Sequence, residues 1–175
     1  MSEAVIRLLV KCGAESIDHP GGTLISHLKR VAALLDGWGA RPALHVAGLG
    51  HAFYGTDGFP TALMALESRD DVRNALGQEA EGIVYRYAAC DRKFTYPSLA
   101  DADGQFRDRF TGEIHVPTPE QRRDFVELTV ANELDLLIVN PEMRATYGEA
   151  LDSLFTRCRE QLSDRAWLAV RQVMR

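Results

Sequence analysis

Four polar residues that can bind a metal ion occur within apolar, helix-patterned segments of the sequence. They are His27, His51, Asp91 and Asn132. Burying such side chains is costly unless they are paired or bound to a metal. Two histidines with oxygen ligands from separate helices are a familiar way to hold a divalent metal in a helical bundle. The alternative for each histidine is a hydrogen-bonded core residue.

The segment around His51 is expected to form a helix whose apolar face ends in that histidine. His51 follows Leu44 by seven residues and Ala47 by four, so the three side chains share one face. Glycine inside a helix costs about 1 kcal/mol relative to alanine. Gly48 and Gly50 therefore indicate a close approach of another backbone or a ligand.

The other three candidates lie on other predicted helices. His27 lies beside an apolar stripe that begins at Leu24. Asn132 interrupts a long apolar helix together with Glu133 and Asp135, and all three side chains cannot easily face solvent. Asp91 is followed by an arginine, so an ion pair at a helix C-terminus is its alternative role.

Three further histidines carry less weight. His19 precedes a Pro-Gly-Gly turn that leads to the His27 helix, so it either lines the same cavity or caps that turn. His45 lies opposite His51 on its helix and is expected at the surface. His115 lies in an irregular segment.

The composition is that of one globular domain. The chain has 175 residues, 46% of them apolar, and a net charge of −5, which gives no reason to expect nucleic acid or an anionic membrane as partner. We find neither a membrane span nor a signal peptide. Three widely spaced cysteines, Cys12, Cys90 and Cys158, indicate reduced thiols in a cytoplasmic protein.

The pattern predicts an all-α fold: a single-domain bundle of about seven or eight helices over residues 1–175, with an irregular insertion at about 93–117. The insertion contains Pro97, Gly104, Gly112 and Pro117, and is either a functional loop or lid or an excursion without function. The spacing of apolar residues predicts helices over 6–12, 24–38, 42–51, 79–90, 118–139, 142–162 and 164–174. Short helices are also expected at 62–66 and 68–77. Thr23, Ser68, Thr118 and Ser163 are the expected N-caps.

Several of these segments resemble the HD-domain superfamily, which is named for a metal-binding His-Asp pair. His-Leu-Lys-Arg-Val-Ala at 27–32, followed by His51, resembles the start of the stringent-response alarmone hydrolases. The segments 72–84 and 130–135 resemble later parts of the same enzymes, and the similarity covers about 19–92 and 125–140. More narrowly, His-Pro-Gly-Gly-Thr at 19–23 and Gly-x-x-His-x-x-Tyr-Gly-Thr at 48–56 resemble an uncharacterised bacterial family without an established reaction.

The resemblance implies a metal held by two histidines and two aspartates. This sequence keeps His27 and His51, but Ala52 stands in place of the paired aspartate and Asn132 in place of the final one. The candidates to complete the ligand set are therefore Asp91, Asn132, Glu133 and His19. The ligand types suit zinc, manganese and iron alike.

We weigh three functions. The first is a metal-dependent hydrolase of a small molecule, phosphorylated compounds included, in which Arg92 neutralises an anionic group and Tyr54 donates a proton. The second is an iron-dependent oxygenase, because some superfamily members such as myo-inositol oxygenase resemble this helical frame and use two irons. A ligand set richer in histidine, with His19 included, would suit iron. The third is a ligand-binding domain that has lost the metal site. Homodimerisation through the apolar face of the last helix stays open.

Overall fold

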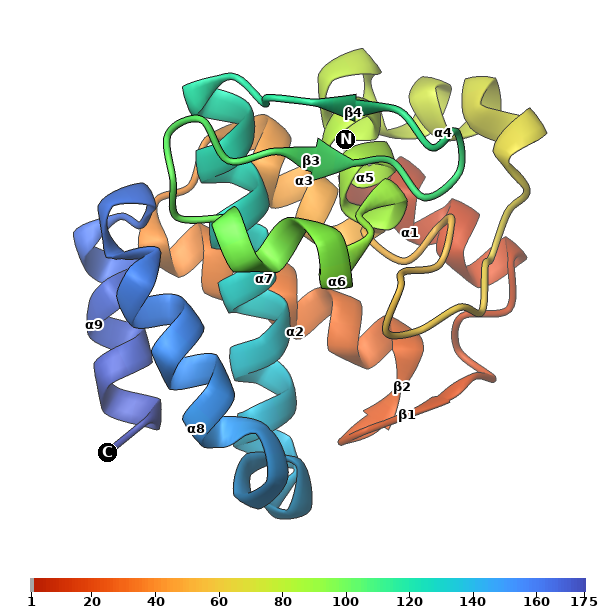
Figure 1. Cartoon of the computed structure of the whole chain (residues 1–175). Coiled ribbons are helices and arrows are strands. Elements are labelled where there is room, and N and C mark those ends of the chain that lie inside the picture. The colour runs from red at the N-terminus through yellow and green to blue at the C-terminus, as the bar shows by residue number, and fades with distance from the viewer. Residues whose placement is uncertain (1) are drawn as a thin grey trace.

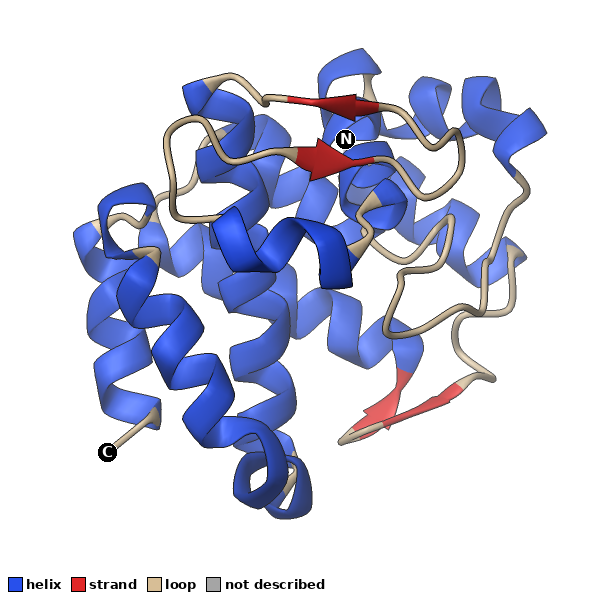
Figure 2. Cartoon of the chain, in the orientation of Figure 1, coloured by secondary structure: helices blue, strands red, loops and turns tan. Residues whose placement is uncertain are grey.

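The structure, a computed structural model, describes residues 2–175 and is built almost entirely of helices (Figures 1 and 2). The all-α fold class predicted from the sequence is confirmed. The α-helices are α1 (Ser2–Lys11), α2 (Leu24–Trp38), α3 (Pro42–Gly50), α4 (Arg69–Leu76), α5 (Gln78–Ala89), α6 (Arg92–Thr95), α7 (Pro119–Val139), α8 (Pro141–Arg157) and α9 (Asp164–Val173).

Two short antiparallel hairpins and three single 3-10 turns connect the helices. The first hairpin pairs β1 (Asp18–His19) with β2 (Gly22–Thr23), and the second pairs β3 (Phe106–Arg107) with β4 (Ile114–His115). The 3-10 turns span Leu66–Ser68, Tyr96–Ser98 and Arg159–Gln161. In Figure 1 the β1–β2 hairpin precedes α2, and the β3–β4 hairpin crosses the opposite end of the molecule.

Helix α7 is the central element, as its apolar sequence predicts. It contacts α2, α5, α8 and α9, and its residues are buried on several sides. Thr118 and Gln121 form a reciprocal capping box at its start, and Pro119 occupies the first turn, where its missing N–H is not needed. Every polar residue on the buried part of α7 must therefore find its partner inside the protein.

Helices α2 and α3 approach each other closely at Gly48. A Cβ atom at that position would lie 2.5 Å from Leu35 Cδ1 and 3.5 Å from the backbone of Ala32. The expected caps of α2 are also present, since Thr23 accepts a hydrogen bond from the Ser26 N–H and Gly39 adopts a left-handed conformation with φ of 76°. The prediction of a close backbone approach at this glycine is confirmed.

Three local predictions are wrong. The helix predicted over 62–66 is absent: residues 62–65 form bends and coil, and a 3-10 turn begins at Leu66. The Ser68 side chain makes no capping hydrogen bond, because that 3-10 turn runs directly into α4. The helix predicted over 142–162 ends at Arg157, where a 3-10 turn leads to α9.

The segment 93–117 is ordered, although its sequence indicates an irregular insertion. The buried Arg122 of α7 donates hydrogen bonds to the carbonyl oxygens of Leu99, Ala102 and Gly104 at 3.2, 3.3 and 2.7 Å. Tyr85 of α5 donates to Asp108 at 2.8 Å, at the start of the β3–β4 turn. These contacts with α5 and α7 hold the segment in place, which its own residue pattern does not reveal.

The three cysteines form no disulfide within residues 2–175, and Cys90 and Cys158 are buried. Burial raises the pKa of Cys90 to about 12 and that of Cys158 to about 11, so both thiols stay protonated. In the part of the chain that the structure describes, no helix is long and apolar enough to cross a membrane.

We predict opposite effects for two helical glycine substitutions. Gly48→Ala should lower the free energy of unfolding by about 1–3 kcal/mol, because the new methyl group overpacks the contact with Leu35. Gly82→Ala is the matched control on α5: no atom lies within 4 Å of the added Cβ, so helix propensity should raise stability by about 0.5–1 kcal/mol. Urea unfolding of both variants measures the difference, and equal shifts would argue against the close approach.

Candidate functional site

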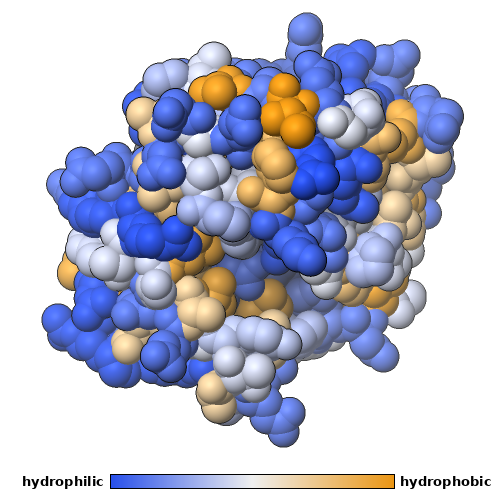
Figure 3. Space-filling view, in the orientation of Figure 1, coloured by the Kyte–Doolittle hydropathy of each residue, from blue (hydrophilic) through white to orange (hydrophobic). Residues whose placement is uncertain are grey.

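A pocket of about 760 Å³ opens between the β1–β2 hairpin, the loop after α3, and helices α6, α7 and α8. In Figure 3 this face of the molecule is hollowed, with hydrophobic residues inside the hollow and hydrophilic ones around it. The volume lies within the range of about 300–1,000 Å³ that is typical of small-molecule sites. His27, His51 and Asn132 line one end of this pocket.

His27 is oriented by a buried carboxylate. Its Nδ1 lies 2.6 Å from Asp135 Oδ2, and Arg30 donates to both oxygens of the same carboxylate at 2.6 and 2.9 Å. Burial opposes ionisation of Asp135, but the hydrogen bonds from His27 and Arg30 hold its pKa below the usual value. An ionised Asp135 accepts the Nδ1 proton of His27, so in the neutral ring the free lone pair is on Nε2.

His51 is oriented in the same way by a backbone carbonyl. Its Nδ1 lies 2.8 Å from the carbonyl oxygen of Gly48, one turn earlier in the chain, and therefore carries the proton. Burial, followed by the neighbouring His27, lowers the pKa of His51 to about 3, so the ring is neutral at pH 7. The lone pair on Nε2 of His51 faces the pocket.

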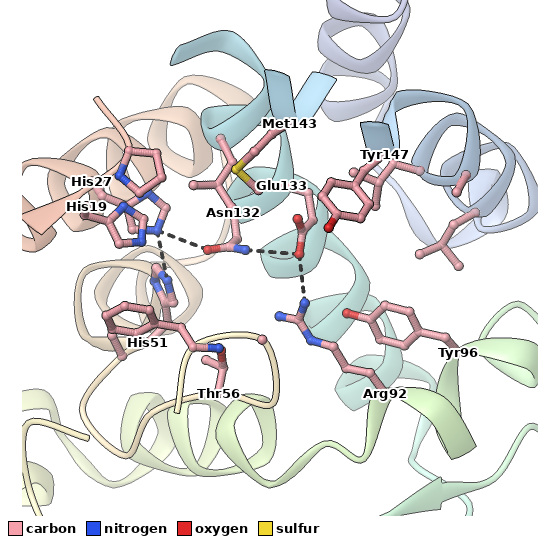
Figure 4. A pocket seen from close by; sticks show the side chains of 18 of the residues that line it. His19, His27, His51, Thr56, Arg92, Tyr96, Asn132, Glu133, Met143 and Tyr147 are labelled. Carbon is pink, nitrogen blue, oxygen red and sulfur yellow. Dashed lines mark hydrogen bonds and ion pairs between the residues drawn. The ribbon is translucent and has the colours of Figure 1, made fainter. Parts of the chain in front are cut away.

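Three acceptor atoms meet at this point (Figure 4). His27 Nε2 lies 3.3 Å from His51 Nε2 and 3.1 Å from Asn132 Oδ1. The Asn132 amide nitrogen donates to Glu133 Oε1 at 3.2 Å, which directs its carbonyl oxygen toward the histidines. Lone pairs at these separations repel one another unless a cation, either a proton or a metal ion, lies between them.

The donor set fits a divalent metal ion. Two nitrogen ligands of a tetrahedral ion, with bonds of about 2.0–2.1 Å, are about 3.3 Å apart. Metal-ligating histidines almost always donate their other ring N–H to a carboxylate or backbone carbonyl, as both histidines do here. Within residues 2–175 no group of three or more His, Cys, Asp or Glu side chains is arranged to hold a metal, so the third protein ligand would be the Asn132 amide.

His19 reaches the same cluster from β1. Its ring stacks on that of His27 with the centroids 4.1 Å apart, and its Nδ1 atom is buried without a hydrogen-bond partner. Burial, with the neighbouring His27, lowers the pKa of His19 to about 4. The stacked ring covers His27 from the hairpin side.

Arg92 and Glu133 form the next polar pair in the pocket. Arg92 Nη1 donates to Glu133 Oε1 at 3.1 Å, the same oxygen that accepts from Asn132. The guanidinium also lies 5.7 Å from the ring centroid of Tyr96. Glu133 is thus held on the arginine side of Asn132 and not against the two histidines.

The structure does not bring Asp91 and Tyr54 to the cluster. Asp91 caps α6 by accepting from the Phe94 N–H at 3.0 Å and faces Arg107, whose Nε lies 3.4 Å away. Tyr54 donates to the buried Glu81 at 2.9 Å, and Arg69 binds the same carboxylate. Both side chains have structural partners outside the pocket, so we do not retain them as a metal ligand and a proton donor.

Two parts of the site are not among the sequence predictions: the role of Asp135 and the contribution of α8. Asp135 follows Asn132 by three residues and so shares its helix face, a spacing that could have identified it. Met143, Tyr147 and Leu151 of α8 also line the pocket. Their helical spacing indicates only an apolar face and not what that face covers.

Comparison with known proteins assigns no function. Residues 8–92 match a family described as a domain of unknown function (DUF6817), so this part of the chain is similar to that family. No curated protein and no solved structure matches the chain. The matched residues contain His19, His27 and His51 but not Asn132, which lies on α7. The resemblance to HD-domain enzymes therefore stays a prediction.

We predict that Tyr54→Phe lowers stability and leaves the site intact. Loss of a hydrogen bond to the buried Glu81 carboxylate should reduce the free energy of unfolding by about 1.5–3 kcal/mol. Tyr147→Phe, which changes an exposed tyrosine, should shift it by less than about 0.5 kcal/mol. Denaturant unfolding and metal titration of both variants test this. Weakened metal binding with unchanged stability in Tyr54→Phe would instead place Tyr54 in the site.

Proposed function

We propose that this chain is a metal-dependent enzyme that hydrolyses a small molecule, with His27, His51 and Asn132 as its protein ligands. One observation supports the proposal above all: at the end of a ligand-sized pocket, His27 Nε2 lies 3.3 Å from His51 Nε2 and 3.1 Å from Asn132 Oδ1, and each of these atoms can act as a metal ligand. The hydrogen bonds to Asp135 and the Gly48 carbonyl hold both rings in the orientation that a metal would require.

A bound divalent ion would lower the pKa of a coordinated water and polarise the bond to be broken. The residues of the chain supply the setting for that chemistry. Ala52, beside His51, adds no carboxylate ligand, so positions on the ion are left for water and substrate. Glu133 accepts hydrogen bonds from Asn132 and Arg92, which orients the amide and keeps an arginine close to where a substrate would bind.

We favour hydrolysis over an oxygenase reaction that needs two iron ions. The described residues offer only one cluster of metal ligands. A pair of ions requires two sets of histidine and carboxylate ligands. The carboxylates nearest the histidines are Asp135 and Glu133, and each is already bound by an arginine. Two outcomes of the test below would contradict this choice: bound iron together with oxygen uptake, or no bound metal.

We predict that the chain purified without added metal or chelator contains close to one zinc or manganese ion. The same stoichiometry should follow when the chelator-treated protein is titrated with either ion by calorimetry. His51→Ala and Asn132→Ala should weaken the affinity for the metal at least tenfold, since each removes one of the proposed metal ligands. We avoid His27→Ala as the main test because it would leave the Asp135 carboxylate short of a buried partner.

His45→Ala is the matched control. His45 lies on α3, and His51 directly follows the last residue of that helix. His45 does not line the pocket, so its loss should leave metal affinity unchanged. Hydrolysis of p-nitrophenyl esters and p-nitrophenyl phosphate, lost with chelator and restored by metal, would support the enzyme. Iron with oxygen consumption would contradict hydrolysis, and no binding by wild-type protein would contradict a metal site.

A further inference from the structure

Much of the pocket wall is apolar. This apolar part of the wall comes from α2, the loop after α3, α7 and α8. The apolar side chains are Leu24, Phe59, Leu136, Met143, Leu151 and Leu154. A ligand that fills this volume gains mainly by removing apolar surface from water, which is worth about 25 cal/mol per Å². The main body of the ligand should therefore be hydrocarbon.

Cationic side chains outnumber acidic ones in the lining of the pocket. Arg92, Lys93 and Arg157 line it, whereas Glu133 is the only acidic side chain among its lining residues. Glu133 is paired with Arg92. In residues 2–175, Lys93 and Arg157 form no ion pair, and Arg157 donates only to the uncharged carbonyl of Pro97 at 3.2 Å. Two positive charges at the rim are thus left without an acidic partner.

Tyr96 adds a hydrogen-bond donor on the Arg92 side of the pocket (Figure 4). Its side chain lines the pocket, and its hydroxyl is buried with no partner in the described part of the chain. Burial raises the pKa of Tyr96 well above its usual value, so the hydroxyl keeps its proton. A buried hydroxyl without a partner is unfavourable, and an acceptor atom on a ligand would satisfy it.

These features do not suit a polyphosphate. A nucleoside diphosphate or triphosphate requires several cations or a glycine-rich loop with free N–H groups, and only two uncompensated cations are available here. We infer that the substrate is an apolar molecule with a single carboxylate, which binds at Lys93 and Arg157 while its other end points toward His27 and His51. The assignment of that other end as the reactive one rests on the proposed function.

The test uses the full chain treated with chelator and four probes measured by calorimetry. Decanoate combines the apolar body and the carboxylate, 1-decanol lacks the charge, acetate lacks the apolar body, and pyrophosphate carries several charges. We expect decanoate to bind at least tenfold more tightly than 1-decanol, with no saturable binding of acetate or pyrophosphate. Equal affinity for decanoate and 1-decanol, or tighter binding of pyrophosphate, would overturn the inference.

Paired charge variants locate the carboxylate. Lys93→Gln with Arg157→Gln should weaken decanoate binding about fivefold and leave 1-decanol unchanged, the size expected for two exposed ion pairs. The control is Lys29→Gln with Arg123→Gln, which removes two exposed cations that lie outside the pocket. It should bind decanoate like the wild type. The same effect from both double variants would show only long-range attraction and would contradict a carboxylate site at the rim.

A third variant tests the tyrosine, and a parallel titration separates the two proposals. Tyr96→Phe should reduce decanoate affinity about threefold without lowering thermal stability, because the hydroxyl that it removes has no partner in the protein. Zinc is titrated into the same preparation. Zinc binding without decanoate binding would overturn the substrate class alone, whereas decanoate binding without zinc binding would overturn the proposed metal enzyme alone.

Discussion

The buried contact between Asp135 and His27 is the interaction on which the site depends. It fixes the proton of His27 on Nδ1 and so turns an acceptor nitrogen toward His51 and Asn132. An ionised carboxylate in this position would be costly if it stood alone, and the two hydrogen bonds from Arg30 make it tolerable. The arginine lies on the hairpin side of α2, where it also donates to the carbonyls of Pro20 and Gly21 and so anchors the loop that carries His19.

The backbone sets the distance between the two imidazoles. Gly48 has no side chain, so α3 can lie directly against Ala32 of α2. The carbonyl of the same glycine accepts the Nδ1 proton of His51, which stands just after the last residue of α3. One small residue thus brings the helices together and orients the second ring. The polar cluster is in this sense a product of helix packing, because no loop has to close for its atoms to meet.

The sequence was sufficient for the parts of this arrangement that follow from local periodicity. Capping residues and apolar spacing predict α2 and α7 to within a residue, and they place His27, His51 and Asn132 on inward faces. The periodicity of apolar residues predicts which face of a helix a side chain occupies, but it does not predict which residue that side chain contacts. Asp91 and Tyr54 were therefore assigned to the site, although they pair with Arg107 and Glu81.

The same limit explains why the sequence did not reveal what holds the irregular segment 93–117 in place. The residues 93–117 contain few helical signals, and their order comes from contacts with α5 and α7 that are distant in sequence. A single buried arginine, Arg122, satisfies three backbone carbonyls there. Neither the identity of that arginine nor its spacing indicates such a role, since arginine in a helix is usually exposed.

Charge balance connects the two proposals. Asp135 is neutralised by Arg30, and Glu133 by Arg92, so the surroundings of the histidine cluster carry little net charge. None of the three proposed ligands is a carboxylate, unlike the aspartates that HD-domain enzymes are named for. A divalent cation bound here would therefore bring positive charge that the protein alone does not balance. The carboxylate inferred for the substrate binds at Lys93 and Arg157, so it would offset that charge by long-range attraction and not by contact. An anionic substrate and the metal should accordingly each strengthen the binding of the other, by the same factor in both directions.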